Sequence, residues 1–245
     1  MQQNGNVPVS AETTRQRLID AGRILEANGL GDFTKGHISV RVPGDDGLFF
    51  MKPHSCGFDE MTPENIVVCN LDGEKVGGGG RRHSEVYIHS EIYKARPDVK
   101  SVIHAHPTHA VALSATGRPL LPLSQPSVVF YDGVPYYTDT IELIRSPDKG
   151  AALARTLGMC RAVLLRNHGV AVVGASIEES TMLAIMLDNA CEIQLAAQAA
   201  GGIGETFAHE SVERLQKSML PTEHYVINFD FLLRKLNRGA AGRAQ

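Results

Sequence analysis

The spacing of apolar residues changes along this chain, and the changes divide it into helices and strands. From Ser10 to Asn28 apolar residues recur at helical spacing, and Asn28 followed by glycine is a typical C-cap, so the pattern predicts a helix. Residues 37–53 and 65–76 instead hold β-branched and aromatic runs interrupted by turn residues, which predicts two strand pairs. The four glycines at 77–80 predict a flexible break.

The second half of the chain alternates helical and strand patterns more closely. Helical spacing and capping residues predict helices over 84–95, after Pro107, over 146–158 and from Ser176 to about Ala200. Strands are predicted over 99–106 and, as strand, turn and strand, over 161–174. The small and polar tail from Gly239 predicts a frayed end. Without a repeat or linker, this mixture indicates one α/β domain over 1–245 with a largely antiparallel sheet.

Composition narrows the class of partner. The formal charge is −3 without a Lys/Arg run, so the electrostatic footprint of a nucleic-acid binder is missing, although Arg82 beside another arginine suits a small acidic partner. No apolar run of about 18 residues predicts a membrane span. The first residues lack the order of a signal peptide, and four scattered cysteines indicate reduced thiols, so we expect a cytoplasmic protein.

Two histidines stand two residues apart in the sequence VIHAHP. On a strand, His104 and His106 point to the same face, so both imidazoles can reach one ion. Imidazole suits zinc, manganese, iron or cobalt. The pattern is equally typical of two half-buried strand histidines with ordinary hydrogen bonds.

His168 and Glu85 extend this candidate site. His168 lies in a turn between two apolar strands, where Gly169 allows a backbone conformation that aims the ring inward, although a turn histidine can also face solvent. Glu85 begins a predicted helix, where the exposed N–H groups alone favour a carboxylate. With three histidines it is also a natural fourth ligand or general base, which is the composition of an open catalytic metal site.

Longer motifs give a family resemblance. HSEVYIHSEIYKARPDVKSVIHAHP followed by LLRNHGVAVVG resembles the class II aldolase/adducin family, and GHISVRVP and TPENIVVCNLDG extend the likeness over residues 14–200. The resemblance implies an α/β/α sandwich with a mainly antiparallel central sheet, usually a homotetramer with active sites at subunit interfaces. It also implies one divalent metal ion per subunit (Zn, Mn, Fe or Co). The implied ligands are His104, His106 and His168, with Glu85 as ligand or acid/base.

Two departures from the sugar-phosphate members bear on the substrate. His37 replaces an asparagine of their GNISVR-like segment, and an Arg82-His83-Ser84 run replaces their hydroxyl pair. Planar charged donors match carboxylates better than phosphate. The chain therefore resembles the decarboxylases of hydroxylated aromatic or pyridine dicarboxylates. A sugar-phosphate aldolase or epimerase is the alternative, and a non-enzymatic adducin-like domain is a third reading.

The decarboxylase reading assigns roles to individual residues. Glu85, His37 or His83 delivers a proton to the ring carbon that loses the carboxylate. Arg82 and Lys35 hold the second carboxylate, and Ser84 is expected to contact the substrate. Two further contacts come from the resemblance alone. They are Gly57, in a loop similar to the family's substrate loop, and Tyr225, in a region that lends a tyrosine to a neighbouring subunit.

Overall fold

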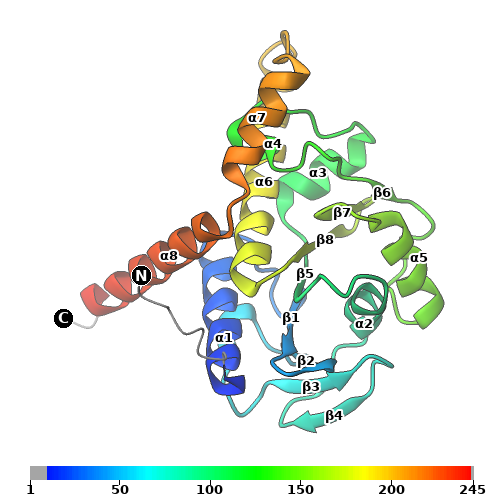
Figure 1. Ribbon diagram of the computed structural model, residues 1–245, viewed down its shortest axis with the longest axis vertical. Helices are drawn as coiled ribbons and strands as arrows, with labels where there is room; N and C mark the ends of the chain where they lie inside the picture. The colour runs from blue at the N-terminus through cyan, green and yellow to red at the C-terminus, as the bar shows by residue number, and fades with distance from the viewer. Residues whose placement is uncertain (1–9, 244–245) are drawn as a thin grey trace, which may run out of the picture.

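Eight strands form one sheet through the centre of the protein, as the computed structural model shows for residues 10–243 (Figure 1). The strands are β1 His37–Val42, β2 Asp45–Met51, β3 Val67–Asn70, β4 Lys75–Gly78, β5 Ser101–Ala105, β6 Tyr136–Tyr137, β7 Ala162–Leu165 and β8 Gly169–Gly174. The helices are α1 Ala11–Ala27, η1 Phe58–Glu60, α2 Val86–Ala95, α3 Thr108–Thr116, α4 Gln125–Val128, α5 Pro147–Leu157, α6 Ile177–Ala199, α7 His209–Met219 and α8 Thr222–Arg243.

The sheet is antiparallel at every pairing except one. Its strand order is β4-β3-β2-β1-β5-β8-β7-β6, and only β6 and β7 pair in parallel. β5 lies in the middle, between β1 and β8. The largely antiparallel sheet predicted from the sequence is therefore confirmed.

Helices cover both faces of this sheet. One face carries α1, α3 and α6, and the other carries α2 and α5 (Figure 1). The apolar core is accordingly split into two clusters. Leu18 of α1 belongs to one cluster together with Ile103 and Val172. Val102 and Ala171, the strand neighbours of Ile103 and Val172, belong to the other. This alternation is the period of two of a sheet buried on both sides, and it confirms the α/β/α sandwich.

Most of the predicted elements begin and end where their capping residues stand. The Oγ atoms of Ser10, Ser146 and Ser176 each accept a hydrogen bond from the backbone N–H three residues ahead, at the starts of α1, α5 and α6. The predicted frayed tail from Gly239 is wrong up to residue 243, because α8 continues there. The helices α7 and α8 were not predicted from the sequence. The signal-peptide expectation concerns residues 1–12, of which 1–9 lie outside the described part.

The pairing of β1 with β5 places two histidines next to each other. His37 on β1 pairs directly with His104 on β5, so the two rings stand on the same face of the sheet, the face covered by α2. Across residues 10–243, no helix is long and apolar enough to cross a membrane.

Candidate metal centre and catalytic site

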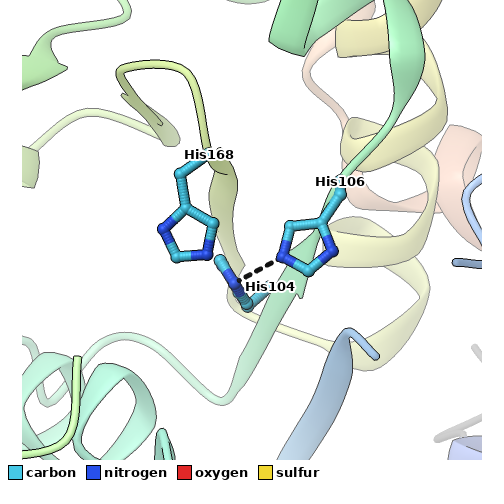
Figure 2. Close-up of side chains that lie close together, drawn as sticks. All are labelled: His104, His106 and His168. Carbon is cyan, nitrogen blue, oxygen red and sulfur yellow. Dashed lines mark hydrogen bonds between the residues drawn. The ribbon is translucent and has the colours of Figure 1, made fainter. Parts of the chain in front are cut away.

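Three histidines converge at the end of the central strand β5. His104 is the last residue but one of the strand, His106 follows just after its end, and His168 comes from the turn between β7 and β8. One nitrogen of each ring lies within 4.8 Å of the others, and Figure 2 shows the three rings gathered around one point. The structure thus brings together the three side chains that the sequence singles out as metal ligands.

Hydrogen bonds fix two of these rings in the form that a metal needs. His104 Nδ1 lies 2.9 Å from the carbonyl oxygen of Val170, and His106 Nδ1 lies 3.1 Å from Asp32 Oδ2. Both partners are acceptors, so each Nδ1 carries the proton and each Nε2 of the neutral ring is bare.

The two bare nitrogens face each other at 3.1 Å, along the dashed line of Figure 2. A hydrogen bond there needs a further proton on His104 or His106, and burial lowers the pKa of both rings. Nitrogen ligands of a tetrahedral zinc ion stand about 3.3 Å apart. The arrangement therefore fits a divalent cation between the rings better than it fits two neutral imidazoles alone.

The turn that carries His168 differs from the prediction in its backbone. The left-handed residue is Asn167, with φ 58°, and not Gly169. Glycine is needed at 169 for space, because a Cβ there would lie 2.5 Å from the Ala105 carbonyl oxygen and 2.7 Å from His106 Cδ2. Close packing of this turn against β5 therefore sets the position of His168. Burial lowers the pKa of His168 to about 4, so the ring is neutral at pH 7.

Glu85 lies beside the three histidines without joining their group. It is the N-cap residue of α2, and its Oε1 accepts a hydrogen bond from the Ile144 N–H at 3.0 Å. Its carboxylate forms a second compact group with His37 and His104, with ligand atoms again within 4.8 Å. Burial raises the pKa of Glu85, which favours the protonated acid. This position suits an acid/base residue or an additional ligand.

Further histidines surround Glu85 on the α2 face of the sheet. The His37 ring centroid lies 4.2 Å from that of His83, 4.8 Å from that of His89 and 4.9 Å from that of His104. Burial lowers the pKa of His83 and His89 to about 3, and that of His37 well below its usual range. These rings are therefore neutral hydrogen-bonding groups at physiological pH.

A cleft of about 540 Å³ is lined by two of the three histidines, His106 and His168. Lys35, Ile141 and Leu143 also line this cleft, and His104 lies buried behind it. Clefts that hold small molecules commonly have volumes of this size. A small substrate can therefore reach the centre from this side.

The other predicted substrate contacts are dispersed. Lys35 lines the cleft and pairs with Asp32 at 3.4 Å, whereas the Arg82 guanidinium donates to the His83 carbonyl and lies over Tyr87. Ser84 is half-buried between His83 and Glu85.

Gly57 and Tyr225 are engaged elsewhere in the chain. The Gly57 N–H donates to Glu60 Oε2, and Tyr225 is 3% exposed within the core. The structure does not bring these two residues to the histidines of this chain.

Three polar residues of the site were not predicted from the sequence. Asp32 supports His106, His89 contacts His37, and Lys52 lies fully buried with its Nζ donating to the Thr34 carbonyl. Burial lowers the pKa of Lys52 to about 8. One signal was present, since Glu85, His89 and Tyr93 recur every four residues and so share one face of α2. Asp32 and Lys52 lie in or beside loops and give no such periodicity.

Known proteins resemble this chain in sequence over most of its length. The Class II Aldolase and Adducin N-terminal domain family matches residues 16–195. The chain is 36% identical over 187 residues to the Meiotically up-regulated gene 14 protein of Schizosaccharomyces pombe, covering 76% of this chain and 73% of that protein. It is 34% identical to Decarboxylase NovR of Streptomyces niveus, covering 69% of this chain and 64% of that one.

The chain is also similar to an adducin and to a solved aldolase structure. Human Gamma-adducin is 35% identical over 78% of this chain, which spans only 28% of the adducin. The solved structure of an L-fuculose 1-phosphate aldolase from Glaciozyma antarctica PI12 superposes with a TM-score of 0.84 and 26% identity, covering 98% and 96% of the two chains. On the motifs, the sandwich and these matches together, the chain belongs to the class II aldolase and adducin family.

Proposed function

We propose that this protein is a divalent-metal-dependent, non-oxidative decarboxylase of a hydroxylated aromatic or pyridine dicarboxylate. The observation that carries the proposal is the pair of buried histidines, His37 and His83, beside Glu85 and the three converging histidines. His37 Nε2 and His83 Nδ1 are both buried with no partner among the described residues. Unpaired nitrogens of two planar rings at this position suit a flat, hydroxylated acid better than a tetrahedral phosphate.

We assign His104, His106 and His168 to the ion. When bound, a divalent ion supplies a Lewis acid that stabilises negative charge developing on an oxygen near the broken carbon–carbon bond. The protein's part is to hold the three rings neutral and aimed. The Val170 carbonyl and Asp32 do this for His104 and His106.

Glu85 is the residue best placed to deliver the proton. Loss of CO₂ from a ring carbon requires a proton at that carbon, and burial raises the pKa of Glu85, which favours the acid form that can donate one. His37 and His83 suit the opposite role at neutral pH, because their lowered pKa values leave them as neutral acceptors. We therefore assign the acid role to Glu85.

Positive charge stands at two sides of the proposed substrate position. Lys35 lies on the cleft wall, and Arg145 is close enough to Glu85 to lower the pKa of its carboxyl against the effect of burial. A second carboxylate of a ring diacid needs such a partner. We propose Lys35 and Arg145 for that contact in place of Arg82, whose guanidinium is engaged by the His83 carbonyl and Tyr87.

The direct test is CO₂ release by the zinc- or manganese-loaded protein on a panel of hydroxyphthalates and hydroxypyridine dicarboxylates. Glu85→Gln should keep the metal and lose CO₂ release, and unchanged turnover would remove its acid role. Cleavage of a ketose phosphate in a parallel assay, with no CO₂ from any ring diacid, would support the aldolase or epimerase alternative. Protein purified without metal, and unable to bind it, would favour an adducin-like interaction domain.

We also propose a homotetramer whose active sites are completed at subunit interfaces. Exposed apolar groups stand on and near the open side of the cleft, with Ile141 67% and Phe33 87% exposed. Such groups favour cover by another chain. Light scattering at micromolar concentration should give four times the chain mass, and a monomer would contradict this assembly.

A further inference from the structure

A continuous buried hydrogen-bond chain runs away from the metal centre behind His37. His37 Nδ1 lies 2.5 Å from His89 Nε2, and His89 Nδ1 lies 2.6 Å from Ser39 Oγ. Ser39 Oγ lies 2.7 Å from the Tyr93 hydroxyl. All four side chains are at most 1% exposed.

Two different repeats bring these four residues together. His37 and Ser39 are two apart on β1 and face the same side of the sheet. His89 and Tyr93 are four apart on α2 and lie on one face of the helix, which packs on that side. The regular spacing of residues on β1 and α2 therefore builds this hydrogen-bond chain and holds its geometry.

The far end of the chain sets the direction of its hydrogen bonds. The Tyr93 hydroxyl donates to the Lys100 carbonyl oxygen at 3.5 Å, and a carbonyl can only accept. Ser39 then donates to Tyr93, His89 Nδ1–H donates to Ser39, and His37 Nδ1–H donates to His89 Nε2. Every proton of the four neutral groups has an acceptor in this direction, and His37 Nε2 is left bare.

The opposite direction pairs fewer protons. It turns the Tyr93 hydroxyl away from Lys100 and leaves a buried N–H at His37 Nε2. The nearest carboxylate oxygen, Glu85 Oε2, is 3.9 Å away, beyond hydrogen-bond distance. Orphaned buried N–H groups are rarer in proteins than acceptors left without a donor. The first direction is therefore the one that the structure favours.

We propose that His89, Ser39 and Tyr93 are positioning residues that hold His37 as its Nδ1–H tautomer, so that the bare Nε2 accepts a hydrogen bond from the ring hydroxyl of the substrate. The identity of that hydroxyl rests on the proposed function, whereas the tautomer does not. An analogue without the hydroxyl leaves the buried Nε2 unpaired, and its kcat/KM should fall by about tenfold to a hundredfold.

The tautomer can be measured without turnover, by ring ¹⁵N NMR of the full-length, zinc-bound protein. The His37 signals are assigned by their loss in His37→Gln. We expect a pyrrole-type Nδ1 and a pyridine-type Nε2. A protonated Nε2 in the unmutated protein would overturn the proposal.

Tyr93→Phe tests the positioning role. It removes the terminal hydroxyl but keeps a ring that packs on Phe49 at 5.2 Å. We expect His37 to become a mixture of both tautomers, and unchanged ring shifts would refute the role of the chain. Tyr131→Phe is the matched control, because Tyr131 also bonds a histidine, His209, but lies outside this chain. It should leave the His37 signals unmoved.

Kinetics separate this inference from the proposed function. With an active substrate, Tyr93→Phe should lower kcat/KM for the hydroxylated acid and have little effect on the analogue that lacks the hydroxyl. Equal losses on both would contradict a role for His37 Nε2 in hydroxyl recognition. If no ring diacid reacts at all, the proposed function fails, and the NMR result alone decides on the tautomer.

Discussion

Replacement of Asp32 tests how the metal centre is organised. The carboxylate accepts from His106 Nδ1 at 3.1 Å, which leaves Nε2 bare and aimed at His104. In Asp32→Asn the amide oxygen can still accept, but the negative charge behind the ring is lost. Removal of such a partner lowers metal affinity by about 10- to 100-fold.

The exposure of Asp32 sets where in this range the effect should fall. Its side chain is 26% exposed, so water screens part of its charge, and we expect the lower end of that range. This amounts to about tenfold weaker zinc binding, or about 1.4 kcal/mol. Competition for zinc against a chromophoric chelator measures the change directly.

A second aspartate supplies the control for this experiment. Asp188 of α6 accepts a hydrogen bond from His109 Nδ1 of α3 at 2.9 Å. His109 is not one of the three converging histidines. Asp188→Asn should leave zinc affinity within about twofold, by the usual independence of residues without shared partners. Equal affinity of Asp32→Asn and the unmutated protein would refute the argument that the carboxylate organises His106.

Three further predictions follow from the same contacts. Gly169→Ala should lower the free energy of unfolding by about 1–3 kcal/mol and weaken zinc binding, because the new Cβ meets the Ala105 carbonyl and the His106 ring. Thermal unfolding with and without zinc checks both effects. His168→Gln should weaken zinc binding by more than about 100-fold yet leave unfolding of the metal-free protein nearly unchanged, and retained affinity would exclude His168 as a ligand. Below pH 6.5 the unfolded chain protonates His89 while the folded ring, with its pKa near 3, does not. The metal-free protein should therefore lose about 1.4 kcal/mol of stability per pH unit from this residue, and urea unfolding at pH 7 and pH 5 should show a smaller loss in His89→Gln.

The sequence predicted those parts of the fold and site that depend on local periodicity. The alternation of Val102, Ile103 and His104 across the sheet follows from the strand period, and the serine caps mark the helix starts. The HAH spacing alone placed two of the converging rings together. These features need no knowledge of distant contacts.

The remainder depends on packing between distant segments. Asp32 bonds His106, which lies 74 residues further along the chain. Lys52 follows β2 and is buried, although the strand pattern before it predicts nothing about where its ammonium group lies. The sequence predicts that Gly169 supplies a special backbone conformation, but its role in the structure is to let β8 approach Ala105. Only the assembled structure shows which surfaces meet, and therefore why these residues stand where they do.

The proposed function requires that one divalent ion, held by His104, His106 and His168, supports CO₂ loss from a hydroxylated ring diacid. The most direct measurement is CO₂ release during titration of the chelator-treated protein with zinc or manganese. We predict no release without metal and a rise that saturates at about one ion per chain. Release that persists after chelation, or a fully loaded protein that releases no CO₂ from any ring diacid of the panel, would contradict it.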